Sequence, residues 1–270
     1  MSSALDRLIG VMALLRDPAK GCPWDIKQDF KSIAPCTLEE AYEVVEAIEN
    51  DDMGHLREEL GDLLLQVVFH AQMALEKGFF DFEDVAKGLA DKLIERHPHV
   101  FGERKDVNSA EDVLSNWEAD KAKKRKAKAS GEDQPPSVLD DVSTALPAAT
   151  RAVKLQKRAA RVGFDWPESK DVIAKIREET DELEAEITAG TGKDAMEDEL
   201  GDLFFALVNL ARHLKIDPEA ALRRTNRKFE SRFRAIESRL HAEGQAIADV
   251  DLDTMERLWG EIKAEEKQKT

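Results

Sequence analysis

The chain has 270 residues, of which 42% are hydrophobic and 36% charged, a balance that excludes a disordered protein and fits one large or two ordinary folded domains. The net charge of −16 argues against a nucleic-acid binder, because an acidic surface repels phosphate backbones, but it permits a small anion bound through a metal. Two cysteines are too few for a disulfide framework. Asp6 and Arg7 lie in the first apolar segment and argue against a signal peptide or a membrane span there. We therefore expect a cytoplasmic protein with neither a membrane partner nor a specific nucleic-acid partner.

Apolar residues recur at spacings of three and four along almost the whole chain, which is the period of an amphipathic α-helix. Helices are therefore expected at about residues 3–16, 38–50, 54–77, 82–97, 109–128, 146–161, 168–189, 194–214, 217–243 and 252–267. We find no run of strict alternation that would indicate a strand. The predicted fold class is all-α.

A break in the apolar pattern divides these helices into two groups of five. Residues 129–137 combine glycine and prolines with polar residues and contain no apolar anchor, as an interdomain linker does. We expect a first domain at residues 1–128 and a second at 138–270.

A basic segment lies just before the linker, where six of the eight residues from Lys121 to Lys128 are lysine or arginine. No aromatic residue lies among them, so we favour a solvated helix end over a nucleic-acid patch.

The two halves repeat one another in order, which predicts two tandem helical-bundle domains. The matching segments are 21–25 with 163–166, 39–43 with 178–182, 59–63 with 199–203, Lys92 and Arg96 with Lys228 and Arg232, and Trp117 with Trp259.

Pairs of acidic residues recur on neighbouring helices of the second half. Glu179 and Glu182 share one helix face, as do Glu199 and Asp202 on the next helix. If the turn at 190–192 folds the two helices antiparallel, the four carboxylates converge and need a cation. Oxygen ligands without cysteine or histidine favour Mg²⁺, with Mn²⁺ as a substitute.

The first half contains the same quartet, namely Glu40, Glu43, Glu59 and Asp62. The alternative interpretation is that all these acids are solvent-facing residues of amphipathic helices. Against it, the segments 63–69 and 203–210 are apolar nearly all round, so we expect Asp62 and Asp202 to be shielded from water.

The pattern Glu-Glu-x-x-Glu followed by Glu-Leu-Gly-Asp-Leu resembles the MazG family of α-helical nucleoside triphosphate pyrophosphohydrolases. The resemblance covers nearly the whole chain and includes residues 21–25, 96–101, 162–166 and 209–214. It implies MazG-like helical domains and Mg²⁺-dependent hydrolysis of NTPs and dNTPs to monophosphate and pyrophosphate. It also implies broad base tolerance and a role in nucleotide-pool clearance.

The resemblance also assigns residues. It makes Glu179, Glu182, Glu199 and Asp202 the metal ligands, with Glu40, Glu43, Glu59 and Asp62 as their first-half counterparts. Substrate contacts are implied for Lys175, Ile176, Arg177, Glu178, Glu179, Glu197, Asp198, Asp202, Lys228, Phe229, Glu230, Ser231, Arg232 and Trp259.

Elementary chemistry bears on several of these roles. For the reaction that the resemblance implies, we expect in-line attack of water on the α-phosphorus, with Glu178 as the candidate general base and Glu182 or a metal-bound hydroxide as alternatives. Lys228 and Arg232 lie on one helix face and could neutralise phosphates; ordinary solvated residues are the alternative. Trp259 could equally stack on a base or anchor a core.

We prefer the second half as the catalytic domain. In the first half, Pro98 should end the helix, so we expect His97 and His99 on either side of it to form a structural turn rather than a metal site. The matching helix of the second half has no such proline and can run on to Leu240. The first half is expected to bind or hydrolyse nucleotides, or to hold a homodimer together. The alternatives are a narrow dUTP or phosphoribosyl-ATP pyrophosphohydrolase, a non-catalytic nucleotide or metal sensor, and a protein-interaction module.

Overall fold

The computed structural model describes residues 3–102, 109, 112–113, 116 and 137–269. Every regular element in this described part is a helix, which confirms the all-α prediction. The chain divides into two compact units, Met1–Ala122 and Lys123–Thr270. The expected linker at 129–137, Trp117 and the basic segment 121–128 lie outside the described residues or at their edge. None of the described helices combines the length and apolar character needed to cross a membrane.

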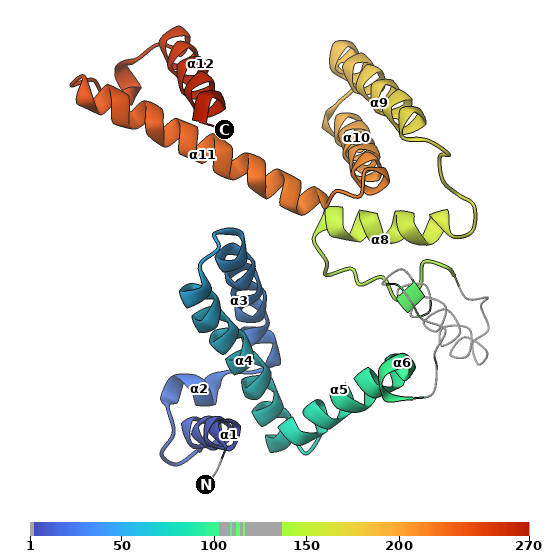
Figure 1. Cartoon of the computed structure of the whole chain (residues 1–270), viewed down its shortest axis with the longest axis vertical. Helices are drawn as coiled ribbons and strands as arrows, with labels where there is room; N and C mark the ends of the chain where they lie inside the picture. The colour runs from blue at the N-terminus through green and yellow to red at the C-terminus, as the bar shows by residue number, and fades with distance from the viewer. Residues whose placement is uncertain (1–2, 103–108, 110–111, 114–115, 117–136, 270) are drawn as a thin grey trace. The chain divides into compact units, whose positions relative to one another are not determined.

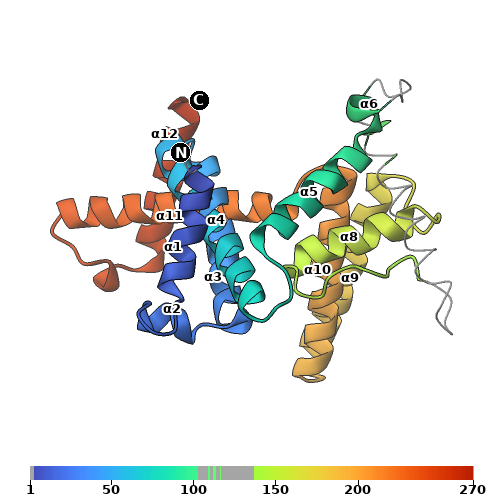
Figure 2. The same ribbon diagram turned by 90° about the horizontal axis from the view of Figure 1, so that it is seen from below.

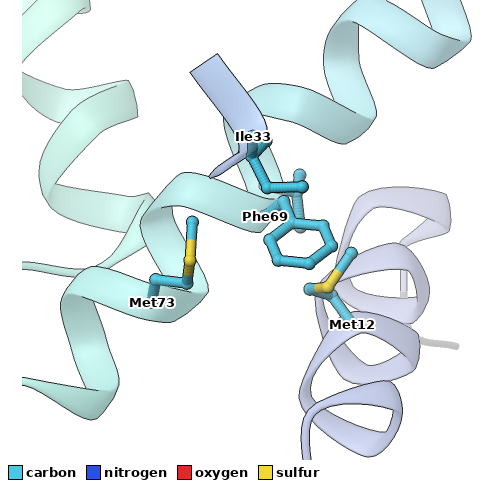
Figure 3. Close-up of a cluster of buried hydrophobic side chains, with 5 residues drawn as sticks. Met12, Ile33, Phe69 and Met73 are labelled. Carbon is cyan, nitrogen blue, oxygen red and sulfur yellow. The ribbon is translucent and has the colours of Figure 1, made fainter. Parts of the chain in front are cut away.

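The first unit is arranged around one long helix. Its helices are α1 (Ala4–Leu15), α2 (Pro23–Lys27), α3 (Phe30–Glu49), α4 (Met53–Glu76), α5 (Phe82–Arg96) and α6 (Pro98–Phe101) (Figure 1). Helix α4 packs against α1, α3 and α5. Where these helices meet, Met12, Ile33, Val68, Phe69 and Met73 form a buried cluster, part of which is shown in Figure 3. This core fixes α3 against α4 and so positions the acidic residues of both helices.

Helix α3 begins eight residues earlier than the sequence predicted, at Phe30 rather than residue 38. Asp29 caps it by accepting hydrogen bonds from the backbone N–H groups of Lys31 and Ser32, and Ser32 completes a capping box. Pro35 lies in the second turn, where it removes only one backbone donor. The cap therefore outweighs the proline as a local determinant of the start of the helix. Helices α2 and α6 were not predicted, because four or five residues are too few to show a period.

The second unit contains two helix pairs. Its helices are α8 (Ala148–Ala160), α9 (Ser169–Ala189), α10 (Lys193–His213), α11 (Pro218–Ala242), the short 3₁₀ helix η1 (Ile247–Asp249) and α12 (Leu252–Lys269). Helix α10 packs against α9 and α8, and α9 and α10 lie side by side in both views (Figure 1 and Figure 2). Helix α12 packs on α11 through Ile236, Leu240, Leu258 and Ile262. The four helices predicted from residue 168 onward are confirmed to within a few residues.

An acidic side chain ties the loop before α9 to the end of α10. Asp165 accepts hydrogen bonds from Arg212 and His213, and the Arg212 guanidinium also donates to the buried Asn209 at 2.9 and 2.7 Å. Partial burial acts to raise the pKa of Asp165, but the hydrogen bonds from Arg212 and His213 outweigh it and lower that pKa. The first unit uses a similar device, in which Arg16 binds Glu76 at 2.7 Å and donates to the backbone carbonyls of Asp25 in α2 and of Gln28 just after it.

Candidate metal and nucleotide site

A glycine-dependent turn joins α9 to α10. Gly190 ends α9 with φ of 63° and Gly192 precedes α10 with φ of 122°, both in the region that glycine adopts without strain. The three-residue connection folds the helices back on each other, as the sequence predicted. It therefore brings the acidic face of α9 against that of α10.

Three of the four predicted second-half ligands come together across this hairpin. Carboxylate oxygens of Glu179, Glu199 and Asp202 all lie within 4.8 Å of one another. Glu179 is buried, with 5% of its surface exposed. Glu182 is not in this group of three, but it is close enough that its charge acts on Glu199. We call Glu179, Glu182, Glu199 and Asp202 the second cluster.

The second cluster is electrostatically unfavourable without a cation. Loss of hydration raises the pKa of Glu199, and the charges of Glu182, Glu179 and Asp202 raise it further. A divalent ion among the carboxylates would relieve this repulsion. Oxygen ligands with no cysteine or histidine among them suit a hard ion such as Mg²⁺, so the residues present fit the predicted metal.

A lysine is bound to the edge of this cluster. Lys175 lies one turn before Glu179 on α9, and its ammonium group is 2.8 Å from Glu179 Oε1 and 2.7 Å from Glu178 Oε1. These two carboxylates raise the pKa of Lys175 well above its usual value. Glu178, the candidate general base, is thus oriented by Lys175.

The first half forms a related cluster between α3 and α4. Carboxylate oxygens of Glu40, Glu43 and Glu59 lie within 4.8 Å of one another, and Glu59 is 8% exposed. Loss of hydration raises the pKa of Glu40, as do the charges of Asp62, Glu43 and Glu59. Asp62 therefore acts on this cluster without joining the group of three. We call the four residues the first cluster.

The expectation that Asp62 and Asp202 are shielded from water is wrong for the single chain. Both are exposed, because the apolar residues beside them on α4 and α10 also face solvent. Leu60 is 50% exposed and Phe204 is 60% exposed. The apolar stretches thus correctly indicate surplus apolar surface, but the described helices that pack on α4 and α10 leave part of that surface exposed.

The basic and aromatic residues predicted to contact substrate form a separate group between α11 and α12. Arg232 donates to Glu266 at 2.9 and 2.7 Å, and its guanidinium lies 5.3 Å from the centre of the Trp259 ring. The Phe229 and Trp259 rings are 5.4 Å apart. The structure therefore builds this group and the second cluster from different helix pairs. Trp259 also packs on the α11–α12 core, which supports its interpretation as an anchor.

The remaining predicted substrate residues are mainly exposed. Arg177, Glu197, Asp198, Lys228, Glu230 and Ser231 are all exposed, and Ile176 is half-buried. Glu230 pairs with Arg234 along α11, and the charge of Lys228 helps to lower the pKa of Glu266. His97 ends α5 and Pro98 begins α6, as expected for a structural turn.

Sequence reasoning missed His55. Its Nε2 lies 2.6 Å from Glu59 Oε1, one turn away on α4, so the first cluster also contains a potentially cationic side chain. The spacing of four residues was visible in the sequence. It could have been found by searching for basic residues one turn from each acid.

Comparison with known proteins gives this geometry a family. The model of the MazG nucleotide pyrophosphohydrolase domain matches twice, at residues 28–101 and 168–236. The chain is 51% identical over 263 residues to the nucleoside triphosphate pyrophosphohydrolase of Escherichia coli K12, covering 97% of this chain and 98% of that protein. It is 41% identical over 262 residues to the nucleoside triphosphate pyrophosphohydrolase/pyrophosphatase MazG of Thermotoga maritima, covering 96% and 95%.

The chain belongs to the MazG nucleotide pyrophosphohydrolase family. This confirms the predicted family and the expectation of an enzyme. Each matched segment contains one complete carboxylate cluster, whereas Trp259 and Glu266 lie beyond the second matched segment. The duplication seen in the sequence is thus a duplication of the family's domain.

Proposed function

We propose that the chain hydrolyses nucleoside triphosphates to monophosphate and pyrophosphate at the second cluster, with Mg²⁺ as its metal and Mn²⁺ as a substitute. The observation that carries the proposal is the convergence of Glu179, Glu199 and Asp202 oxygens within 4.8 Å across the α9–α10 hairpin. The reaction follows from the names of the E. coli and T. maritima relatives, which align over nearly the whole chain.

Glu179, Glu199 and Asp202 would hold the metal, with Glu182 beside them. When bound, the metal supplies charge neutralisation for the polyphosphate. The chain contributes the rest of the chemistry: Glu178, held by Lys175, accepts a proton from the attacking water. The new bond forms between the water oxygen and the α-phosphorus, and the bond to the bridging oxygen breaks so that pyrophosphate leaves. Glu182 is the alternative proton acceptor.

We further propose broad tolerance of base and sugar, and a homodimer. Support for the dimer is the exposed apolar surface next to both clusters, which includes Leu60, Leu64, Leu200 and Phe204. Surface of this kind beside a functional site is typical of an interface. A second copy would also shield Asp62 and Asp202 from water, as the sequence pattern led us to expect.

Product analysis tests the function directly. Wild type, Glu179→Gln and Glu40→Gln would each be incubated with a panel of NTPs and dNTPs, with Mg²⁺ or with EDTA. We expect monophosphate and pyrophosphate from several triphosphates, only with metal, and a loss of at least about 100-fold in Glu179→Gln. Glu256→Gln on α12, an exposed position outside the matched segments, is the control for removal of one negative charge.

Three outcomes would change or refute the proposal. Loss of activity in Glu40→Gln rather than in Glu179→Gln would move the chemistry to the first cluster. Turnover of dUTP alone, or of phosphoribosyl-ATP alone, would replace broad tolerance with a narrow specificity. Absence of metal-dependent pyrophosphate release from every triphosphate would refute the enzymatic role and leave a sensor.

A further inference from the structure

The second cluster contains its own positively charged group. Lys175 contacts two carboxylates at once, Glu178 at 2.7 Å and Glu179 at 2.8 Å, and its side chain is only 31% exposed. Glu179 has a side chain that is 7% exposed and is one of the three residues whose oxygens converge. A cation thus already occupies the most buried of the predicted metal ligands.

We propose that Lys175 is a resident counter-ion that competes with the metal for Glu179 and is released toward the phosphates when the metal binds. The inference rests on the proposed function, because it assumes that the second cluster holds a metal. It gives Lys175 two linked roles. The first, which is new, weakens metal affinity; the second, the substrate contact that the family resemblance already implies, strengthens triphosphate affinity.

Electrostatics gives the sign of the first role. An ammonium group beside a metal site repels a divalent ion and occupies an oxygen that the ion needs. Without it, the cluster would bind metal more tightly but would also carry one more uncompensated negative charge in the free protein. The second role follows because an ammonium displaced from Glu179 keeps only one carboxylate partner, Glu178, and can donate to an incoming polyanion.

The first cluster provides a natural comparison. The residue that corresponds to Lys175, four positions before Glu40, is Cys36, which carries no positive charge. His55 contacts Glu59 there instead, and the residue corresponding to His55 in the second half is Ala195. The acids therefore repeat between the halves, whereas the cation beside them does not.

The test measures Mn²⁺ affinity by electron paramagnetic resonance of free Mn²⁺ in the full chain. A Glu59→Gln background disables the first cluster, so that the signal reports the second. We expect Lys175→Gln to lower the Mn²⁺ dissociation constant about tenfold, and Lys175→Arg to stay within about twofold of the parent. Lys170→Gln is the matched control: Lys170 is on the same helix but pairs with Glu168, so its loss should have no effect.

A second readout separates this mechanism from a structural defect. With Mn²⁺ saturating, Lys175→Gln should bind a non-hydrolysable triphosphate about tenfold more weakly, although it binds the metal more tightly. Opposite changes in the two affinities are not expected from a loosened helix. In the reciprocal experiment, Cys36→Lys in a Glu199→Gln background should weaken Mn²⁺ binding at the first cluster about tenfold.

The outcomes are distinguishable. Equal or weaker Mn²⁺ binding by Lys175→Gln, with the parent binding normally and the variant folded by circular dichroism, would overturn the counter-ion role alone. Absence of Mn²⁺ binding in the Glu59→Gln parent would overturn the metal site of the proposed function together with this inference.

Discussion

The two carboxylate clusters occupy the same kind of helix hairpin, yet they are completed differently. The second cluster draws one close ligand from α9 and two from α10, whereas the first draws two from α3 and one from α4. A lysine accompanies the second cluster and a histidine the first. Equal spacing of acids in the sequence thus produces similar charge but a different set of closely spaced carboxylates.

The helices after the hairpins also differ. Helix α5 has 15 residues and ends before Pro98, whereas α11 has 25 residues and carries Arg232 to a contact with α12. Lys92 and Arg96 repeat the basic pair of the second half, but Pro98 ends their helix within two residues of Arg96. The two halves thus share their acids and differ in the cations beside those acids and in the helix that follows.

The largest expected effect is on catalysis, and it tests whether the two clusters differ in activity. Glu199→Gln should lower kcat for NTP hydrolysis by about 100-fold or more, because it removes a central carboxylate of the second cluster. Its counterpart Glu59→Gln should change kcat less than about threefold. Steady-state pyrophosphate release with saturating Mg²⁺ measures both. Comparable losses in the two variants would show that the halves act together.

A second prediction compares the ion pair between Arg16 and Glu76 in the first unit with that between Arg212 and Asp165 in the second. The Arg16 guanidinium lowers the pKa of Glu76, so this carboxylate stabilises the fold above its unfolded pKa, and the stabilisation is lost as pH falls through the lowered folded value. Glu76→Gln should therefore cost about 1 kcal/mol at pH 7, because Arg16 is largely buried and bound through two nitrogens. The difference from wild type should disappear at low pH.

Chemical denaturation at several pH values measures this effect, and Glu83→Gln on the exposed side of α5 is the control. Asp165→Asn should behave in the same way in the second unit, since the hydrogen bonds from Arg212 and His213 also lower the pKa of Asp165. A difference from wild type that persists unchanged below the pKa of a free carboxylate would contradict the assignment to these ion pairs.

Much of this architecture could be predicted from residue spacing. The three- and four-residue periods gave the long helices, and the positions of Glu179, Glu199 and Asp202 followed from helix geometry and a glycine turn. The start of α3 was harder to predict, because the hydrogen bonds by which the Asp29 side chain caps the first N–H groups are not visible in apolar periodicity. The helix therefore begins ahead of Pro35, earlier than predicted.

Tertiary contacts account for the other differences. Periodicity shows that α4 and α10 have apolar residues on several sides, but it does not show whether their own chain covers them, so the exposure of Asp62 and Asp202 was mispredicted. In the same way, the shared face of Lys228 and Arg232 did not reveal that Arg232 binds Glu266 on α12.

The smallest expected effect concerns stability without metal. The pKa values of Glu199 and Glu40 are raised in the folded protein, so folding favours the protonated form of each side chain. The stability that this protonation provides is fully present below the pKa of the unfolded chain. It is lost as pH rises through the pKa of the folded protein. At pH 7 the ionised Glu199 and Glu40 side chains therefore lower the stability of the fold. Glu199→Gln and Glu40→Gln should each raise the melting temperature in EDTA by a small amount, on the order of one or two degrees.

With Mg²⁺ present, wild type should melt at a higher temperature than Glu199→Gln, the opposite of the result expected in EDTA. Wild-type melting temperature should rise with Mg²⁺, since an ion that binds only the folded state stabilises it, and Glu199→Gln should lose most of that rise. Glu40→Gln should retain the part of the rise contributed by the second cluster. Differential scanning calorimetry in EDTA and in Mg²⁺ distinguishes these cases. If Glu40→Gln removes the whole Mg²⁺ effect while Glu199→Gln removes none, the metal binds the first cluster, and the difference between the halves is opposite to the one proposed.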